Sequence, residues 1–252
     1  MKQEKIRLDK LLLQRQLTSS RERAQALIIA GKVLVNGQKV EKSGTGVNAE
    51  DEIRLLGEDL KYVSRGGLKL EHAIAHWKIE VSKKVCMDVG TSTGGFTDCL
   101  LQHGALSVLA VDTGRGQIDF RLRQDPRVRL LEDTNARYLT AEQVGESVDL
   151  IVMDVSFISA TLVLPAVIAA AFRDTVSMPL SRGLVVLVKP QFEVGRELVG
   201  KGGIVRDPEA HNLAVDKVRN AVAVLGGQDI HVIESPILGA EGNREFLLHA
   251  IF

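Results

Sequence analysis

The 252-residue chain has few aromatic side chains and almost no cysteine. Phe, Trp and Tyr make up 4% of its residues, and its two cysteines are Cys86 and Cys99. Two cysteines are too few for a disulfide framework, and this pair does not indicate a metal site. We therefore expect two small buried thiols, no bound metal, and a reducing, cytoplasmic environment.

Long hydrophobic runs are also missing. The longest mostly apolar stretch, residues 158–172, is interrupted by Ser159, Thr161 and Pro165. A membrane-spanning helix needs about 20 apolar residues, more than this stretch contains. The N-terminus is charged, and no apolar signal segment follows it. We expect a soluble protein without a membrane partner.

The chain has no net charge, but its charges are unevenly distributed. Residues 1–65 hold 13 Lys and Arg against 9 Asp and Glu, which puts +4 on this end and −4 on the remainder. Residues 1–42 alone hold 10 basic and 4 acidic groups. A locally basic end predicts a polyanionic partner, although a solvated helical face would give the same pattern.

Residues 1–60 have the pattern of a small domain. Leucines recur at helical spacing between residues 8 and 17, and a second helical pattern ends at Gly31. Asn36-Gly37 between short apolar runs predicts a tight hairpin, because both turn positions need positive φ. The sequence therefore predicts a small α+β domain.

Residues 61–68 are interpreted as a linker, because two glycines follow a polar run there, and residues 69–252 as a second domain. In this second part, apolar runs alternate with helical patterns. That alternation is typical of a Rossmann-like α/β fold with a parallel, doubly wound sheet buried on both faces. We expect its strands at residues 85–89, 107–111, 128–131, 148–153, 184–188, 230–233 and 246–251.

Residues 85–96 combine a strand, a glycine-rich loop and the start of a helix. Such a helix start can hold a polar ligand on its free N–H groups. The pattern here is Asp88-x-Gly90-x-x-x-Gly94-Gly95, whereas a dinucleotide loop has Gly-x-Gly-x-x-Gly. An acid two residues before the first glycine is closer to an S-adenosylmethionine loop.

A further carboxylate follows the next predicted strand. Asp112 lies 18 residues after Gly94, where an acid can accept hydrogen bonds from both ribose hydroxyls of an adenosine. An ordinary turn with a solvated Asp is the alternative, but the loop and Asp112 together favour an adenosyl cofactor. The candidate cofactor-binding residues in this region are Asp88, Gly90, Ser92, Gly94, Gly95, Phe96 and Asp112.

Four polar residues, Asp88, Asp112, Asp154 and Lys189, each stand at the C-terminal end of a predicted parallel strand. Ligands bind at that edge of open α/β sheets. Four such residues together indicate one site rather than four solvated turns.

With S-adenosylmethionine as cofactor, the protein must position a nucleophile in line with the methyl group and manage its proton. Lys189 is the candidate base, helped by a second cation such as Lys69. Asp154 is placed to orient Lys189, and Glu245 to hold the other lysine.

Residues 6–56 resemble the small RNA-binding domain first seen in ribosomal small-subunit protein four, the S-four domain. Matching residues are Arg7-Leu-Asp9, Ser20-Arg21, Ala24 and Gly31-Lys-Val-Leu-Val-Asn-Gly37. The resemblance implies binding of structured RNA through shape and phosphate contacts. Candidate RNA-binding residues are Arg7, Lys10, Arg15, Arg21, Arg23 and Lys32, with Arg65 at the junction, and Arg196 and Lys201 in a glycine-rich stretch, 190–206, expected to be a substrate lid.

The second domain resembles the FtsJ-like 2′-O-ribose methyltransferases, whose catalytic set runs Lys, Asp, Lys, Glu in chain order. The matching positions are Lys69 in Ser-Arg-Gly-Gly-Leu-Lys69, Asp154 in Met-Asp154-Val-Ser-Phe-Ile-Ser, Lys189 in Val-Lys189-Pro-Gln-Phe-Glu, and Glu245 in Gly-Asn-Arg-Glu245-Phe. That family also has an acid contacting adenine after the third strand, for which Asp133 and Asn135 are both candidates. Asp154 is also expected to contact the cofactor.

With the S-four domain included, nearly the whole chain resembles the TlyA family of ribosomal RNA methyltransferases, also labelled haemolysins. The resemblance implies S-adenosylmethionine-dependent methylation of a cytidine 2′-hydroxyl in ribosomal RNA. The large subunit is the expected target, with the small subunit open as a second one, and the enzyme is expected to be a monomer or weak dimer. Two alternatives are a non-catalytic RNA-binding or assembly factor and a membrane-active haemolysin.

Overall fold

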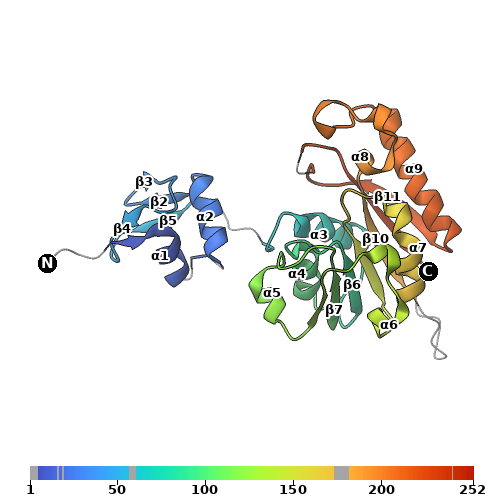
Figure 1. The fold of residues 1–252 in the computed structure, drawn as a ribbon, viewed down its shortest axis with the longest axis horizontal. Coiled ribbons are helices and arrows are strands. Elements are labelled where there is room, and N and C mark those ends of the chain that lie inside the picture. Colours follow the sequence, from blue (N-terminus) through green and yellow to red (C-terminus); the bar gives the residue numbers. More distant parts are fainter. Residues whose placement is uncertain (1–4, 16, 19, 57–60, 173–181, 240) are drawn as a thin grey trace. The chain divides into compact units, whose positions relative to one another are not determined.

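The computed structural model describes residues 5–15, 17–18, 20–56, 61–172, 182–239 and 241–252. The chain divides into two compact units, Met1–Leu60 and Lys61–Phe252 (Figure 1). Residues 61–68, interpreted above as a linker, belong to the second unit. Tyr62 is buried in its core, and helix α3 (Gly66–Trp77) begins inside the segment. The glycines there allow close packing, since a Cβ on Gly67 would lie 2.4 Å from the Tyr62 ring.

The N-terminal unit is a small α+β fold around one core. Leu8, Leu12 and Ile28 are fully buried in it. Its elements are β1 (Ile6–Arg7), α1 (Leu8–Gln14), α2 (Arg21–Ile29), β2 (Val33–Val35), β3 (Gln38–Lys39), β4 (Gly46–Val47) and β5 (Ile53–Leu55). The expected hairpin joins β2 to β3, with φ of 50° at Asn36 and 78° at Gly37.

A buried carboxylate ties this unit together. Asp9 is fully buried, and its carboxylate accepts hydrogen bonds of 2.9 Å from each of Arg7, Arg21 and Gln25. The hydrogen bond from Arg7 favours the ionised carboxylate most, so the pKa of Asp9 lies well below its usual range. Two of the predicted RNA-binding arginines, Arg7 and Arg21, therefore also hold the fold.

The second unit is the predicted Rossmann-like α/β fold. Its strands are β6 (Val85–Val89), β7 (Ser107–Val111), β8 (Val128–Leu131), β9 (Leu150–Met153), β10 (Gly183–Val188), β11 (Gln228–Glu234) and β12 (Phe246–Ile251), in the order β11-β12-β10-β9-β6-β7-β8. Strands β10, β9, β6, β7 and β8 pair in parallel, but β12 is antiparallel to both β10 and β11. The prediction of a fully parallel sheet is therefore wrong at this edge. No helix is found in residues 235–239 and 241–245. The chain therefore turns back directly from β11 into β12, and these two strands pair antiparallel.

Helices cover both faces of the sheet, and alternate strand residues supply the two cores. Cys86, Val108 and Leu150 pack with α3 and its neighbours, whereas Met87 and Ile151 pack on the opposite face. The first face carries α3, α4 (Gly95–Gln102) and α5 (Phe120–Gln124), and the second carries α7 (Leu164–Ala171) and α9 (Pro208–Val224), with α6 (Ala141–Val144) after β8. Both cysteines are free and buried, as expected.

The glycine-rich stretch 190–206 is not a long irregular loop. It contains helix α8 (Pro190–Glu193) and the short 3₁₀ turns η3 (Arg196–Leu198) and η4 (Lys201–Gly203). A further 3₁₀ turn, η1 (Ala136–Tyr138), follows β8, and another, η2 (Ala160–Leu162), precedes α7. With α8, η3 and η4, the segment that follows β10 lies beside the end of that strand, because Val199 and Gly203 line the same cavity as Lys189.

Replacing Asp9 with Asn tests the carboxylate at the centre of the N-terminal unit. The amide cannot satisfy three donors as an anion does, so Asp9→Asn should cost about 1–3 kcal/mol at pH 7. A lowered pKa stabilises the fold above the unfolded value, about 3.9, and this contribution disappears as the pH falls toward the lower folded value. The difference in unfolding free energy between variant and wild type should therefore become smaller below about pH 4. Hydrogen exchange of peptides from residues 5–56 measures this unit separately; a gap that stays constant with pH would contradict the assignment.

Candidate active site

Two cavities meet at the C-terminal edge of the parallel strands. The first, of about 500 Å³, is the lysine cavity, because Lys69 and Lys189 both line it. The second, of about 600 Å³, is the Asp112 cavity. Both have volumes usual for small-molecule sites. They share the lining residues Gly90, Ser92, Asp154, Ser156 and Phe157. Two ligands could therefore lie side by side with this shared wall at their junction.

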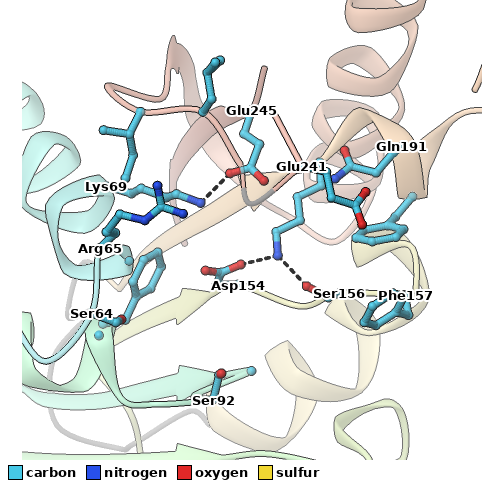
Figure 2. A pocket seen from close by; sticks show the side chains of 18 of the residues that line it. Ser64, Arg65, Lys69, Ser92, Asp154, Ser156, Phe157, Gln191, Glu241 and Glu245 are labelled. Atoms are coloured by element: carbon cyan, nitrogen blue, oxygen red, sulfur yellow. Dashed lines mark hydrogen bonds and ion pairs between the residues drawn. The ribbon is translucent and has the colours of Figure 1, made fainter. Parts of the chain in front are cut away.

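Two lysine–carboxylate pairs lie in the lysine cavity. Lys69 Nζ donates to Glu245 Oε2 at 2.5 Å, and Lys189 Nζ lies 2.6 Å from Asp154 Oδ1 (Figure 2). Each lysine side chain is only 10% exposed. The fold therefore brings together all four residues of the predicted catalytic set, from α3 and from the ends of β9, β10 and β12.

Residues outside the predicted set complete the cavity. Lys189 Nζ also donates to Ser156 Oγ at 2.7 Å. Phe157 is 91% exposed with φ of 63°, and its ring lies 5.4 Å from that of Phe192. Gln191 and Glu241 also line the cavity. Ser156 and Phe157 lie within the Asp154 motif, and their closeness to Asp154 is the signal in the sequence that points to them.

The glycine loop is shaped by close backbone approach. Gly90 has φ of 86°, and a Cβ there would lie 2.4 Å from the carbonyl oxygen of Asp154. A Cβ on Gly94 would meet Leu122 at the same distance. Gly90, Ser92, Gly95 and the buried Phe96 line the lysine cavity, whereas Gly94 is buried and lines neither cavity. The loop can keep this backbone path only with Gly90 and Gly94 free of side chains.

Asp112 fixes the backbone on both sides of its cavity. Its Oδ2 accepts from Ser92 N at 2.7 Å, and its Oδ1 accepts from Gly114 N at 2.6 Å. Asn135 also lines this cavity. In contrast, the Asp133 side chain is 66% exposed and lies 3.9 Å from Arg115. Of the two alternatives left open by the sequence, the cavity therefore includes Asn135.

Asp88 lies beneath the loop. It is fully buried, and its Oδ2 accepts from Thr97 Oγ1 at 2.7 Å, while Oδ1 has no hydrogen-bond partner among the described residues. Burial raises the pKa of Asp88 to about 7. The expected cofactor-binding acid thus lines neither cavity in this structure.

Comparison with known proteins identifies the family. The FtsJ-like methyltransferase model matches residues 62–252, and the S4 domain model matches residues 6–53. The chain belongs to the FtsJ-like methyltransferase family. Both resemblances predicted from the motifs are thereby confirmed.

Several relatives align with this chain across both of its units. YqxC of Bacillus subtilis, a candidate rRNA methyltransferase, is 44% identical over 250 residues, covering 99% of this chain and 86% of that protein. The 16S/23S rRNA (cytidine-2′-O)-methyltransferase TlyA of Mycobacterium tuberculosis is 44% identical over 245 residues, covering 97% and 89%. The solved structure of a hemolysin candidate from Streptococcus thermophilus aligns with a TM-score of 0.74 and 41% identity, covering 98% and 88%.

The FtsJ-like family and its fold imply the use of S-adenosylmethionine, and the residues present fit that cofactor. The Asp112 cavity has apolar walls for a purine, formed by Val89, Val111, Ala136, Ile158 and Val163. Polar side chains suitable for ribose hydroxyls, those of Asp112 and Asn135, lie in the same cavity. The shared wall then leads to the lysine cavity.

The predicted RNA-binding residues fall into three groups. Arg65 lines the lysine cavity, and Arg196 and Lys201 are exposed on η3 and η4 without lining it. In the N-terminal unit, Lys10 and Lys32 are exposed and Arg23 is half-buried. Arg15 donates to the backbone oxygens of Ala49 and Asp51, so it anchors the segment before β5 as well.

The raised pKa of Asp88 predicts a pH-dependent stability. An acid whose folded pKa lies near 7, against about 3.9 unfolded, destabilises the fold progressively as the pH rises from about 4 to 7. Asp88→Asn resembles the protonated acid. Without ligand, the difference in unfolding free energy between variant and wild type should therefore shift in favour of the variant by about 1–4 kcal/mol from pH 5 to pH 8. Thermal unfolding at both pH values measures this. An equal difference at the two values would show that Asp88 is already ionised at pH 5.

Proposed function

We propose that the protein transfers a methyl group from S-adenosylmethionine to the 2′-hydroxyl of a cytidine in ribosomal RNA. The observation that carries the proposal is the convergence of Lys69, Asp154, Lys189 and Glu245 in one cavity beside the glycine loop. The Mycobacterium tuberculosis relative aligns with nearly all of this chain, and its name, a 16S/23S rRNA (cytidine-2′-O)-methyltransferase, supports ribosomal RNA as the substrate. Which ribosomal subunit supplies the RNA is for the assay below to decide.

The cofactor contacts are assigned to the wall that the cavities share and to the Asp112 cavity. Gly90, Ser92 and Asp154 would lie against the methionine part, because they line both cavities. Asp112 and Asn135 would hold the adenosine. Asp112 can do so while bonded to two amides, since a carboxylate has about four acceptor sites. Asp88, Gly94 and Asp133 act indirectly, because none of them lines either cavity.

Methyl transfer requires an oxygen nucleophile that loses its proton. The cofactor supplies the electrophilic methyl group, and the protein must align the ribose oxygen with it. Lys189 Nζ is held by Asp154 and Ser156; as the neutral amine it would take the proton of the 2′-hydroxyl, and Asp154 would stabilise the ammonium formed. Lys69, held by Glu245, adds a second positive charge in the same cavity. Asp154 and Glu245 fix the positions of the two lysines.

The alternatives receive less support. A non-catalytic binding factor would have no use for two buried lysine–carboxylate pairs, since such pairs seldom improve stability over apolar residues. A membrane-active haemolysin is suggested by the name of the Streptococcus thermophilus structure. Among the described residues, however, no helix has the length and apolar character to cross a bilayer.

The N-terminal unit is proposed to bring the enzyme to structured RNA. The S4 domain match covers most of it, and S-four domains recognise RNA by shape and phosphate contacts. Lys10 and Lys32 are the sharpest candidates here because they are exposed. Arg7, Arg15 and Arg21 have structural hydrogen bonds, so their variants would confound binding with folding.

The catalytic assignment is tested with labelled S-adenosylmethionine and purified 16S and 23S ribosomal RNA, free and in subunits. Lys189→Ala should reduce methyl transfer about 10²–10⁴-fold, because it removes the proton acceptor, while cofactor affinity stays within about twofold. Lys84→Ala, which removes a lysine just before β6 that lines neither cavity, controls for the loss of charge. Nuclease digestion and mass spectrometry then locate the label on the ribose.

Four outcomes separate the functions. Label on a ribose that disappears in Lys189→Ala establishes the reaction and the subunit. Undiminished turnover in the variant would remove Lys189 from the mechanism. Cofactor binding without label on any ribosomal RNA would point to another substrate, and absence of cofactor binding would favour the non-catalytic factor.

The RNA-binding role of the N-terminal unit is tested by reversing two exposed charges, Lys10→Glu with Lys32→Glu. Affinity for the RNA should fall. The slope of log K against log salt should become less steep by about 1–2, because fewer counterions are released when phosphate contacts are lost. Lys78→Glu with Lys83→Glu makes the same charge change before β6, at the opposite edge of the sheet from the site. Equal salt slopes for the two double variants would show that Lys10 and Lys32 do not contact RNA.

A further inference from the structure

The lysine cavity depends on a short irregular segment, residues 155–159, between β9 and η2. This segment carries Ser156, which accepts a hydrogen bond from Lys189 Nζ beside the ion pair with Asp154. At its centre Phe157 has φ of 63°, a conformation that glycine adopts readily but that is unfavourable for a bulky residue. Its side chain is almost fully exposed and packs against the Phe192 ring. Such a backbone persists only where its surroundings hold it in place.

A buried carboxylate provides that hold. Glu193 is 5% exposed. Its Oε1 accepts from Ala160 N at 2.7 Å, and its Oε2 accepts from Ser159 Oγ at 2.5 Å. Lys217 on α9 lies 3.4 Å from Oε2 and also donates to the Glu193 backbone oxygen at 2.7 Å. The carboxylate therefore joins the end of the segment to α8 and α9.

The same four-residue helix connects this carboxylate to the lysine. Lys189 is the N-cap of α8, and Glu193 is its last residue. One end of α8 thus bears the ammonium group, while the other end fastens the segment whose Ser156 holds that group. We propose that Glu193 is a positioning residue, which sets the place of Ser156 and, through it, the orientation of the Lys189 side chain.

The arrangement is more specific than stability alone requires. A buried carboxylate is desolvated, and its hydrogen bonds and partial ion pair at most offset that cost. Apolar residues could join α8 to η2 without it. Directional bonds to one amide and one hydroxyl, however, fix the register of the segment, as nonspecific packing cannot. The inference about lysine orientation stands on these contacts; only its catalytic consequence rests on the proposed function.

Competitive labelling of lysines by acetic anhydride tests the proposal without an activity assay. Lys69 and Lys189 are equally exposed in the structure, so Lys69 serves as an internal control in the full-length chain. In Glu193→Ala, labelling of Lys189 should rise about fivefold or more relative to Lys69. Ser159→Ala removes only one hydroxyl and should give a smaller rise in the same direction. Glu197→Gln, at an exposed carboxylate four residues further on, should change neither lysine.

Each result decides the proposal. A selective rise at Lys189 supports it, whether or not the wild type methylates any RNA tested, so this test can succeed where the proposed function fails. No change at Lys189 overturns it. A parallel rise at Lys69 and Lys189 with a lower melting temperature also overturns it, since Glu193 would then only stabilise the fold. If the wild type is active, kcat of Glu193→Ala should fall about 10–100-fold with KM for RNA unchanged, and an unchanged kcat would limit the role of Glu193 to the resting enzyme.

Discussion

The ion pair between Lys189 and Asp154 is the contact on which the rest of the site depends. It joins two neighbouring parallel strands at the edge where both end. The pairing of β9 with β10 places Met153 beside Val186, so Asp154 follows at once while β10 continues for two more residues. The long lysine side chain can therefore fold back over Leu187 to the level of Asp154. A shorter cation could not bridge this offset, and an arginine would not be a proton acceptor.

The second lysine–carboxylate pair depends on the direction of β12. Residue Val188 of β10 pairs with Phe246, so Glu245 stands just before β12, beside the end of β10. An antiparallel strand begins at the edge where its parallel neighbours end. A parallel final strand would have put Glu245 at the opposite edge of the sheet, far from Lys69. The one strand whose direction differs from the prediction is thus the strand that completes the site.

This difference shows where sequence reasoning succeeds and where it stops. Apolar runs such as residues 107–111 predict buried strands because both faces of the sheet are covered, and that information is local. The glycine pattern predicts a loop for a similar reason, since Gly90 must lie against the Asp154 backbone. Strand direction is not local. It depends on whether a helix intervenes, and the residues between β11 and β12 carry only turn signals.

Side-chain partners are still less predictable. Basic residues near the N-terminus look alike in a sequence, yet Arg21 bonds to a buried carboxylate while Lys10 faces solvent. Asp112 was expected to bind the ribose hydroxyls of the cofactor, but it also accepts hydrogen bonds from two backbone amides. Glu193 gave no signal at all, because its partners are a backbone amide and a serine some thirty residues earlier in the chain. The proposed catalytic residues could be named from a family resemblance, whereas the residues that hold them required the fold.

Charge also divides the two cavities in a way that suits the proposed ligands. The charged residues that line the Asp112 cavity are Asp112 and Asp154, both acidic. The lysine cavity holds Arg65, Lys69 and Lys189 beside three carboxylates. A sulfonium cofactor is a cation and is favoured by the acidic side, whereas an RNA backbone is an anion and is favoured where the basic groups lie. Asp154 belongs to both cavities, at the place where the methyl group would pass from one ligand to the other. The residue that orients Lys189 is therefore also the carboxylate best placed to favour a positive charge in the shared wall.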